Sequence, residues 1–121
     1  MVESIFTIHQ SLRGEMKSNI FTGTEIKLNV SIEPIGGLTM DEYDFKVDVF
    51  CSNSKVVSVK KDDAIRVDEK NYIVLVDTNI VGQGRLRCKI TAELPDDDFA
   101  DGYRTEIAII DTGIDIIKSL R

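Results

Sequence analysis

The sequence is poor in the residues on which most catalytic sites depend. It has no tryptophan, a single histidine (His9) and an aromatic content of only 7%. A nucleophilic triad needs a Ser, Cys or Lys side chain held beside a base, and one histidine near the N-terminus offers no such arrangement. Glycosidase chemistry by paired carboxylates stays open from the sequence, although no cleft residues stand out. We therefore expect no catalytic residues and a protein that is not an enzyme.

Cysteine is equally scarce. Cys51 and Cys88 both fall on the apolar phase of expected strands, where a free thiol behaves as a small buried hydrophobic side chain. Two isolated thiols and His9 do not supply the ligand set of a metal site, and there is no CxxC motif for redox chemistry. We expect no metal, no cofactor and no structural disulfide.

Basic clusters and long apolar runs are also missing. The 15 Lys and Arg residues are outnumbered by 21 Asp and Glu residues, and the net charge of −6 repels a polyanion. The longest apolar stretches are too short to span a bilayer, and the N-terminus carries no basic region followed by an apolar run. We expect a chain that is made in the cytoplasm and that binds neither nucleic acid nor membrane.

The residues that are present indicate one β-rich domain. A chain of 121 residues can bury one core, and most of its apolar residues are Ile, Val and Leu, which suit a pleated sheet. Residues 24–33 and 43–51 alternate between apolar and polar side chains, which predicts two half-buried strands. Pro34 and Gly36-Gly37 predict a loop after the first of them. Residues 55–60 and 64–67 predict two shorter strands at the border of a sheet.

Residues 71–110 form the centre of the expected fold. The run from Tyr72 to Val76 is apolar throughout, so both faces of this strand require cover, by the core or by another subunit. Tyr72, Val74 and Val76 are accordingly candidate interface residues, with burial in the core as the alternative. Asp77-Thr78-Asn79 predicts a cap on a single helical turn that ends near Val81. Residues 85–94 predict a long strand with Leu86, Cys88, Ile90, Ala92 and Leu94 directed inward.

An acidic hairpin and a return strand follow. Residues 95–102 contain four Asp residues, which could bind calcium or could form an ordinary solvated turn; the glutamate that closes an EF-hand loop is missing. Residues 103–110 predict a strand with Tyr103, Thr105, Ile107 and Ile109 on one phase. Asp111-Thr112-Gly113 predicts a turn, and residues 114–119 a last strand or a short helix.

The N-terminal residues allow two interpretations. Residues 5–10 predict a short strand, which the polar segment 13–19 separates from the main body. This strand is either the edge of a sheet or an arm in which Ile5, Phe6 and Ile8 dock on a neighbouring subunit by strand addition. The expected organisation is an N-terminal strand or arm in residues 1–20 and a single β-sandwich domain in residues 21–121.

The regular spacing of short strands and turns predicts an all-β fold, a two-sheet antiparallel sandwich of roughly seven or eight strands, immunoglobulin-like in the broad sense. Two hallmarks of true immunoglobulin domains are absent. There is no tryptophan, and Leu86 stands two residues before Cys88, where the corner tyrosine would be.

Residues 72–77, 82–84, 86–94 and Arg104-Thr105-Glu106 carry a resemblance to a known group of proteins. The chain resembles small sandwich proteins of phages and prophages of Bacteroides-type gut bacteria and, more distantly, the N-terminal domain of upper baseplate proteins of siphophages. The similarity covers roughly residues 20 to 118 as a pattern of strands and turns.

This resemblance implies a structural protein of the virion, in the tail, baseplate or head fibre. Its partners would be other virion proteins or copies of itself, and a homo-oligomer is expected. The alternative is a carbohydrate- or cell-surface-binding sandwich, for which Tyr43, Tyr72, Phe99 and Tyr103 are the aromatic platforms available.

Overall fold

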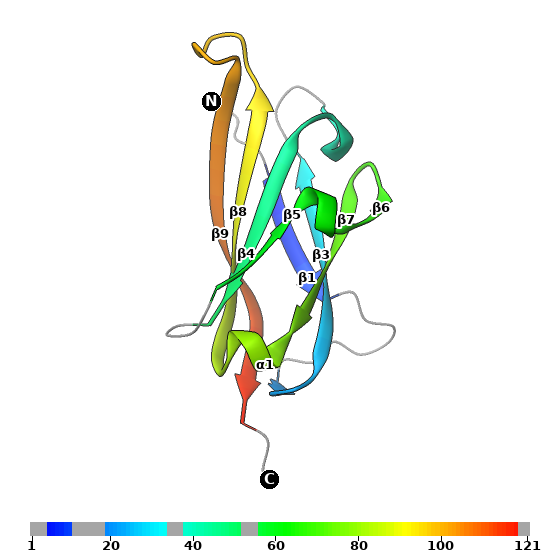
Figure 1. Ribbon diagram of the computed structural model, residues 1–121, viewed down its shortest axis with the longest axis vertical. Coiled ribbons are helices and arrows are strands. Elements are labelled where there is room, and N and C mark those ends of the chain that lie inside the picture. The colour runs from blue at the N-terminus through cyan, green and yellow to red at the C-terminus, as the bar shows by residue number, and fades with distance from the viewer. Residues whose placement is uncertain (1–4, 11–18, 34–37, 52–55, 119–121) are drawn as a thin grey trace.

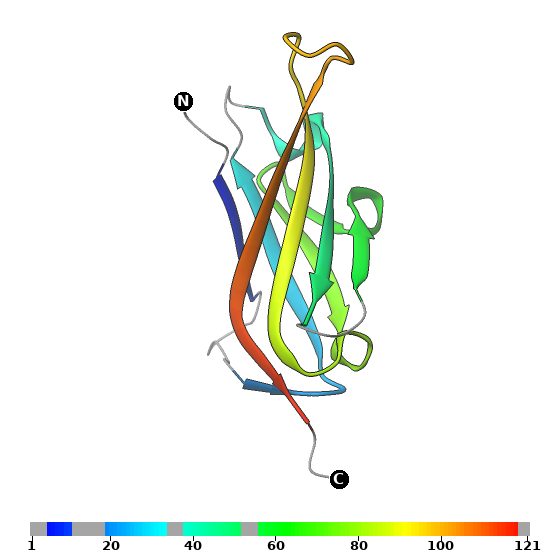
Figure 2. The same ribbon diagram turned by 90° about the vertical axis from the view of Figure 1, so that its left-hand side faces the viewer.

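The structure is a computed structural model that describes residues 5–10, 19–33, 38–51 and 56–118. This part of the chain is mostly β, with nine strands in two sheets that pack face to face (Figures 1 and 2). Residues 13–18 of the polar segment, the loop predicted at residues 34–37 and the side chain of His9 lie outside the described residues. The two-sheet, mostly-β prediction is confirmed.

The first sheet has four strands, all antiparallel, in the order β1 (Ile5–Gln10), β3 (Glu25–Glu33), β7 (Asn71–Asp77) and β6 (Ile65–Asp68). The second has five, in the order β2 (Asn19–Phe21), β9 (Tyr103–Ile117), β8 (Gly84–Pro95), β4 (Asp44–Phe50) and β5 (Val57–Lys60). Three short helical turns join strands: η1 (Met40–Glu42), η2 (Lys61–Asp63) and α1 (Thr78–Val81).

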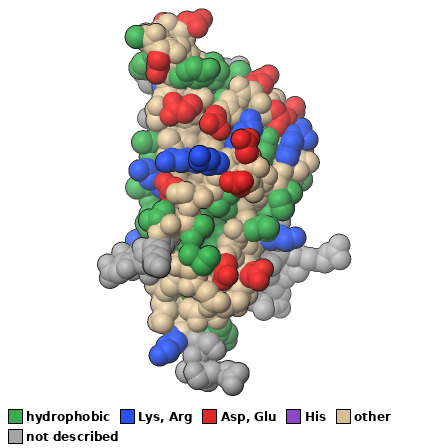
Figure 3. Space-filling model, in the orientation of Figure 1, with side chains coloured by type: hydrophobic (Ala, Val, Ile, Leu, Met, Phe, Trp, Pro, Cys, Tyr) green, Lys and Arg blue, Asp and Glu red, His purple; other side chains and the backbone are tan. Residues whose placement is uncertain are grey.

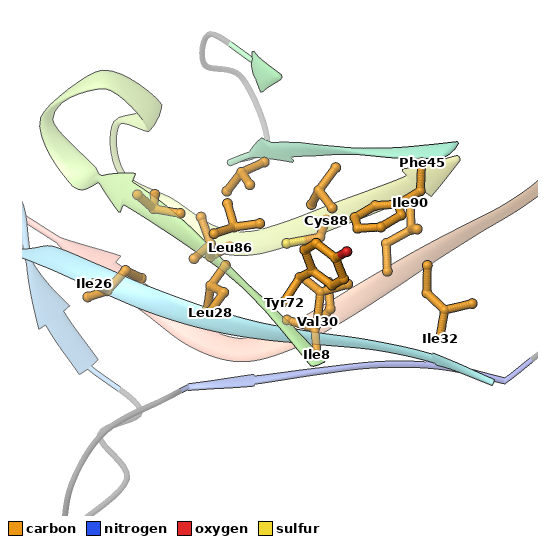
Figure 4. Close-up of a cluster of buried hydrophobic side chains, with 14 of the residues drawn as sticks. Ile8, Ile26, Leu28, Val30, Ile32, Phe45, Tyr72, Leu86, Cys88 and Ile90 are labelled. Atoms are coloured by element: carbon orange, nitrogen blue, oxygen red, sulfur yellow. The ribbon is translucent and has the colours of Figure 1, made fainter. Parts of the chain in front are cut away.

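The alternating strands lie where the sequence predicts them. Every second side chain of β3, β4, β7 and β8 is buried between the sheets, because successive side chains of a strand point to opposite faces. The core therefore forms from facing rows of aliphatic residues (Figure 4), with Leu28 and Ile32 of β3 across from Leu86 and Ile90 of β8. Cys51 and Cys88 are free and buried, as predicted.

The second sheet is mixed, where an antiparallel sheet was predicted. The difference comes from β2, whose three residues pair in parallel with residues 115–117 at the end of β9. This strand brings the described total to nine. A three-residue strand carries too little alternation to be recognised in a sequence, and its pairing depends on a strand far along the chain.

The turn predicted at Asp111-Thr112-Gly113 is wrong, because β9 continues through it to Ile117. The pairing with β8 shifts register at this point, so that Arg87 lies opposite Asp111 and Arg85 opposite Asp115. The extra residues form a bulge in which Gly113 has a φ of 76°, a conformation that favours glycine. The hydroxyl of Thr112 donates to the Leu86 carbonyl at 2.7 Å, which ties the bulge to β8.

The predicted helical turn after β7 is confirmed as α1. The Asp77 carboxylate accepts a hydrogen bond from the Asn79 N–H at 2.9 Å, as an N-cap does. Thr78 is fully buried, and its hydroxyl donates to the Thr24 carbonyl at 2.7 Å while it accepts from the Gly23 N–H at 2.9 Å. Thr78 thus fastens α1 to the turn that precedes β3.

Candidate interaction surface

The most apolar exposed strand of the molecule is β9. Its odd-numbered residues from Tyr103 to Asp111 face solvent, and its even-numbered residues are half-buried. Ile107 and Ile109 are 56% and 66% exposed, and they are the aliphatic centre of this outer row. Apolar side chains lie along the left-hand rim of the molecule, on the side of β9, and a band of basic side chains runs from this rim toward the middle (Figures 1 and 3).

The same strand has an open edge. Within the described part of the chain, β9 pairs with β8 along its length but with β2 only at residues 115–117. Residues 103–111 therefore have a ladder partner on one side only, and alternate backbone N–H and C=O groups point away from the sheet. Figure 2 shows this edge, with β1 of the other sheet as the nearest strand beside it. An exposed edge next to an apolar row is the type of surface to which another strand can add.

The sequence placed its interface candidates elsewhere. Tyr72, Val74 and Val76 are 4%, 0% and 1% exposed, so the inward face of β7 is core and offers no surface to a partner. Tyr72 lies against Phe45 of the opposite sheet with a centroid distance of 5.2 Å, at 85° between the rings (Figure 4). The outward face of β7 carries Leu75, which is 55% exposed. This face is the second apolar side that the continuous run in the sequence indicated.

The N-terminal candidates lie in an edge strand. β1 pairs with β3 from Ile5 opposite Glu33 to Gln10 opposite Leu28. Ile8 is buried in the core, Phe6 is half-buried against it, and Ile5 is 58% exposed. An arm that docks on a neighbouring subunit would have to leave this pairing.

The acidic hairpin between β8 and β9 extends beyond the body of the sandwich (Figure 1). Its carboxylates shape the turn: Asp96 accepts from the Asp98 N–H at 3.0 Å and pairs with Arg104 at 2.8 Å, and Asp101 accepts from the Tyr103 N–H at 3.1 Å. These are the bonds of an Asx-type turn. Among the described residues, no three His, Cys, Asp or Glu side chains come together in a way that could hold a metal ion.

An acidic cleft of about 650 Å³ lies at the base of this hairpin, beside η1 and η2. Its walls include six carboxylates: Asp41, Glu42, Asp44, Asp62, Glu93 and Asp101. Lys61, also in the wall, donates to the Tyr43 carbonyl at 2.7 Å. The cleft is open and strongly anionic, so it suits cations better than neutral or acidic ligands.

One of these carboxylates is engaged in a polar link between elements. Arg66 of β6 donates two hydrogen bonds to Asp41 of η1, at 2.8 and 2.9 Å, and the Tyr72 hydroxyl donates a third at 2.5 Å. The Arg66 bonds and then the Tyr72 bond lower the pKa of Asp41 to about 2, because they stabilise its ionised form. This cluster holds η1 against the first sheet and has the features of a structural contact.

The thiols lack the features of nucleophiles. Burial raises the pKa of Cys88 to about 12 and also raises the pKa of Cys51. The Cys51 thiol points at the Gly82 and Gly84 carbonyls, at 3.6 and 3.7 Å. A reactive cysteine needs a lowered pKa and access to solvent, and these two side chains are buried and protonated at neutral pH.

Sequence reasoning missed Ile107 and Ile109 as surface residues. Residues 103–110 show apolar side chains on both phases, since Ala108 and Ile110 alternate with Ile107 and Ile109. The alternation therefore could not decide which phase faces the core. One signal was available: the even phase continues through Ile114 and Ile116, which are both buried.

None of the helices in the described ranges has the length and apolar character needed to cross a membrane. Comparison of the chain with models of protein families, with curated proteins and with solved structures found no match.

Proposed function

We propose that this protein is a non-enzymatic structural component of a phage virion, in the tail, baseplate or head fibre, and that it acts through contacts with other virion proteins or with copies of itself. The observation that carries the proposal is the exposed row of Ile107 and Ile109 beside the open edge of β9. Contiguous exposed apolar surface on a folded domain is typical of protein contacts. The resemblance in residues 72–77, 82–84, 86–94 and 104–106 supports the assignment to a virion.

The proposal includes an immunoglobulin-like topology. Without the short strands β2 and β5, the two sheets have the orders β1-β3-β7-β6 and β9-β8-β4. These orders correspond to the arrangement of strands A, B, E and D against strands G, F and C in constant-type domains. This correspondence supports the finer assignment, while the missing tryptophan and the leucine at position 86 depart from it.

A structural role also agrees with the state of the chemically active side chains. The two thiols are buried, the hairpin carboxylates Asp96 and Asp101 are occupied by turn and ion-pair contacts, and Asp41 is held by Arg66. These groups stabilise the fold in the positions in which they lie.

The alternative is a carbohydrate- or cell-surface-binding module. Of the four aromatic platforms, Tyr43 and Tyr72 belong to the core, and Phe99 and Tyr103 are about half exposed. Tyr103 also lines the acidic cleft, which gives this alternative one specific site. Retention of glycans on an array by the intact chain, lost in Tyr103→Ala, would favour it over the structural proposal.

The proposal is tested on purified particles. Phage particles from an induced host that carries the coding sequence are banded on a density gradient, and the chain is quantified by mass spectrometry against the major capsid protein. We expect a constant ratio through the particle band. A chain that stays at the top of the gradient, apart from the particles, would overturn the proposal.

A further inference from the structure

We infer that β9 is a self-association strand, on which a second copy of this chain pairs antiparallel across a two-fold axis at Ala108. The inference rests on the proposed function and gives it a partner. The two second sheets would become one continuous sheet, with β9 of one copy beside β9 of the other.

The edge of β9 is long and lacks the usual protection. Exposed edges in natural sheets are blunted by short strands, by lysine or proline, or by unpaired charges that point inward. The edge strands β5 and β6 have only four residues each, whereas the open edge of β9 runs from residue 103 to residue 111. That stretch contains neither lysine nor proline.

The inward-pointing charges of this edge are already held in ion pairs. Arg104 forms ion pairs with Asp96 at 2.8 Å and with Glu106 at 3.0 Å, and its side chain is only 29% exposed. A neighbouring strand would therefore meet a paired cluster, with one excess negative charge, rather than an unpaired ion. From residue 107 to residue 110 the strand is uncharged and entirely apolar.

The charge pattern selects the register. A two-fold axis at Glu106 or at Asp111 would set identical carboxylates directly opposite each other, which is unfavourable. An axis at Ile107 would bring the two Glu106 side chains to diagonal positions, which is also unfavourable. An axis at Ala108 avoids these contacts, and so does one at Ile109, but an axis at Ile109 would set Ile107 opposite Asp111 of the second copy. The axis at Ala108 sets Ile107 opposite Ile109 of the second copy, twice by symmetry, so that the four most exposed aliphatic side chains of the edge cover one another.

A second copy is the partner that this pattern fits, because the apolar centre at residues 107–110 complements itself and the flanking charges stay apart in this register. In the Ala108 register Thr105 faces Asp111 of the second copy. Within each copy the Thr105 hydroxyl donates to Glu93 at 2.8 Å and Asp111 pairs with Arg85 at 3.6 Å, so both polar groups keep the partners that they already have. The contact is isologous and closes as a dimer. It leaves the acidic hairpin and the outward face of β7 free for other virion proteins.

The first test is the solution mass of the full chain by sedimentation equilibrium at about 100 μM, a concentration at which association of micromolar affinity is nearly complete. We expect twice the chain mass of 13.6 kDa. Ile107→Lys should be a folded monomer by circular dichroism. Leu75→Lys is the matched control, because Leu75 is 55% exposed and Ile107 is 56% exposed, and it should remain a dimer. A monomeric unmodified chain, or a dimer that survives Ile107→Lys, would overturn the inference.

The second test fixes the register through disulfides. Directly opposite residues in an antiparallel pair lie within disulfide reach, whereas diagonal residues do not. Under mild oxidation, Ile107→Cys and Ile109→Cys should each stay uncross-linked alone and should form a covalent dimer when mixed; Cys51 and Cys88 are buried in both. Self-cross-linking of Ile107→Cys alone, or no product in the mixture, would overturn the register. A monomer in the first test would leave the virion proposal standing, since the particle experiment decides that separately.

Discussion

Two core tyrosines offer a paired test of how buried hydroxyl groups contribute to this fold. Tyr43 and Tyr72 are 5% and 4% exposed, and both rings pack edge-on near Phe45, at centroid distances of 6.5 and 5.2 Å. The Tyr72 hydroxyl donates to Asp41 at 2.5 Å. The Tyr43 hydroxyl is buried and finds no hydrogen-bond partner among the described residues. The two Tyr→Phe substitutions therefore remove the same atom from opposite situations.

The two substitutions should change the free energy of unfolding differently. A hydrogen bond to a charged group contributes about 1.5–3 kcal/mol, and Asp41 is partly exposed, so Tyr72→Phe should lower the free energy of unfolding by about 1–2 kcal/mol. Burying a hydroxyl without a hydrogen-bond partner destabilises the folded state by about 1–3 kcal/mol. Removing the hydroxyl recovers this energy but loses the packing contacts of the oxygen, so the net gain is smaller. Tyr43→Phe should therefore leave the free energy of unfolding unchanged or raise it by about 1 kcal/mol.

Urea unfolding followed by circular dichroism measures both values. With a slope of about 2 kcal/mol/M for a domain of this size, Tyr72→Phe should move the midpoint down by about 0.5–1 M, and Tyr43→Phe should hold it or move it up. The slopes should match that of the unmodified chain. Equal losses in the two variants would refute the reasoning, because the Tyr43 hydroxyl would then have a partner worth as much as Asp41.

Three further predictions follow from burial and charge. The folded-state pKa of Asp41 is lowered from 3.8 to about 2, so its contribution to the stability of the fold is present above pH 4 and disappears as the pH falls toward 2. The melting temperature of Asp41→Asn should therefore lie below that of the unmodified chain at pH 6 and approach it at pH 2. A difference that stays constant with pH would contradict the Arg66 pairing. Burial raises the pKa of Cys88 to about 12, and it also raises the pKa of Cys51. A thiol reagent at pH 8 should therefore label neither cysteine in the native chain and both in urea. Fast labelling of the native chain would show that the core is open. Ile8→Ala should lower the free energy of unfolding by about 2 kcal/mol and the melting temperature by several degrees, because Ile8 is only 8% exposed. Ile5→Ala is the control and should change both values little, because Ile5 is 58% exposed. An unchanged melting temperature for Ile8→Ala would favour an N-terminal arm that docks on another subunit.

Much of the strand layout was readable because alternation and turn residues act locally. The strands around residues 24–33, 43–51, 71–77 and 85–94 and the cap at Asp77 all follow from side chains within a few positions of one another. The bulge at Gly113 was read as a turn for the same reason, since Asp-Thr-Gly satisfies turn chemistry whether or not the chain reverses. Only the pairing with β8 on both sides of the bulge keeps β9 straight enough to continue.

The candidate surface could not be read in the same way. Tyr72 and Ile107 are both large residues in runs that are apolar on both phases, so the pattern alone allows each of them to face the core or the solvent. The position of each strand in its sheet made the choice. β7 lies inside its sheet, with Tyr72 toward the core, whereas β9 lies at an open edge with Ile107 toward solvent.

By itself the sequence determined a β-rich fold with buried thiols and acidic turns. These properties depend on composition and on neighbours along the chain. The tertiary structure alone decided that β2 joins β9 in parallel, that Tyr72, Val74 and Val76 are core, and that residues 103–111 form the open edge. The physical reason is that strand order and facing are set by long-range pairing, in which each strand takes the side that buries the most apolar surface against partners distant in sequence.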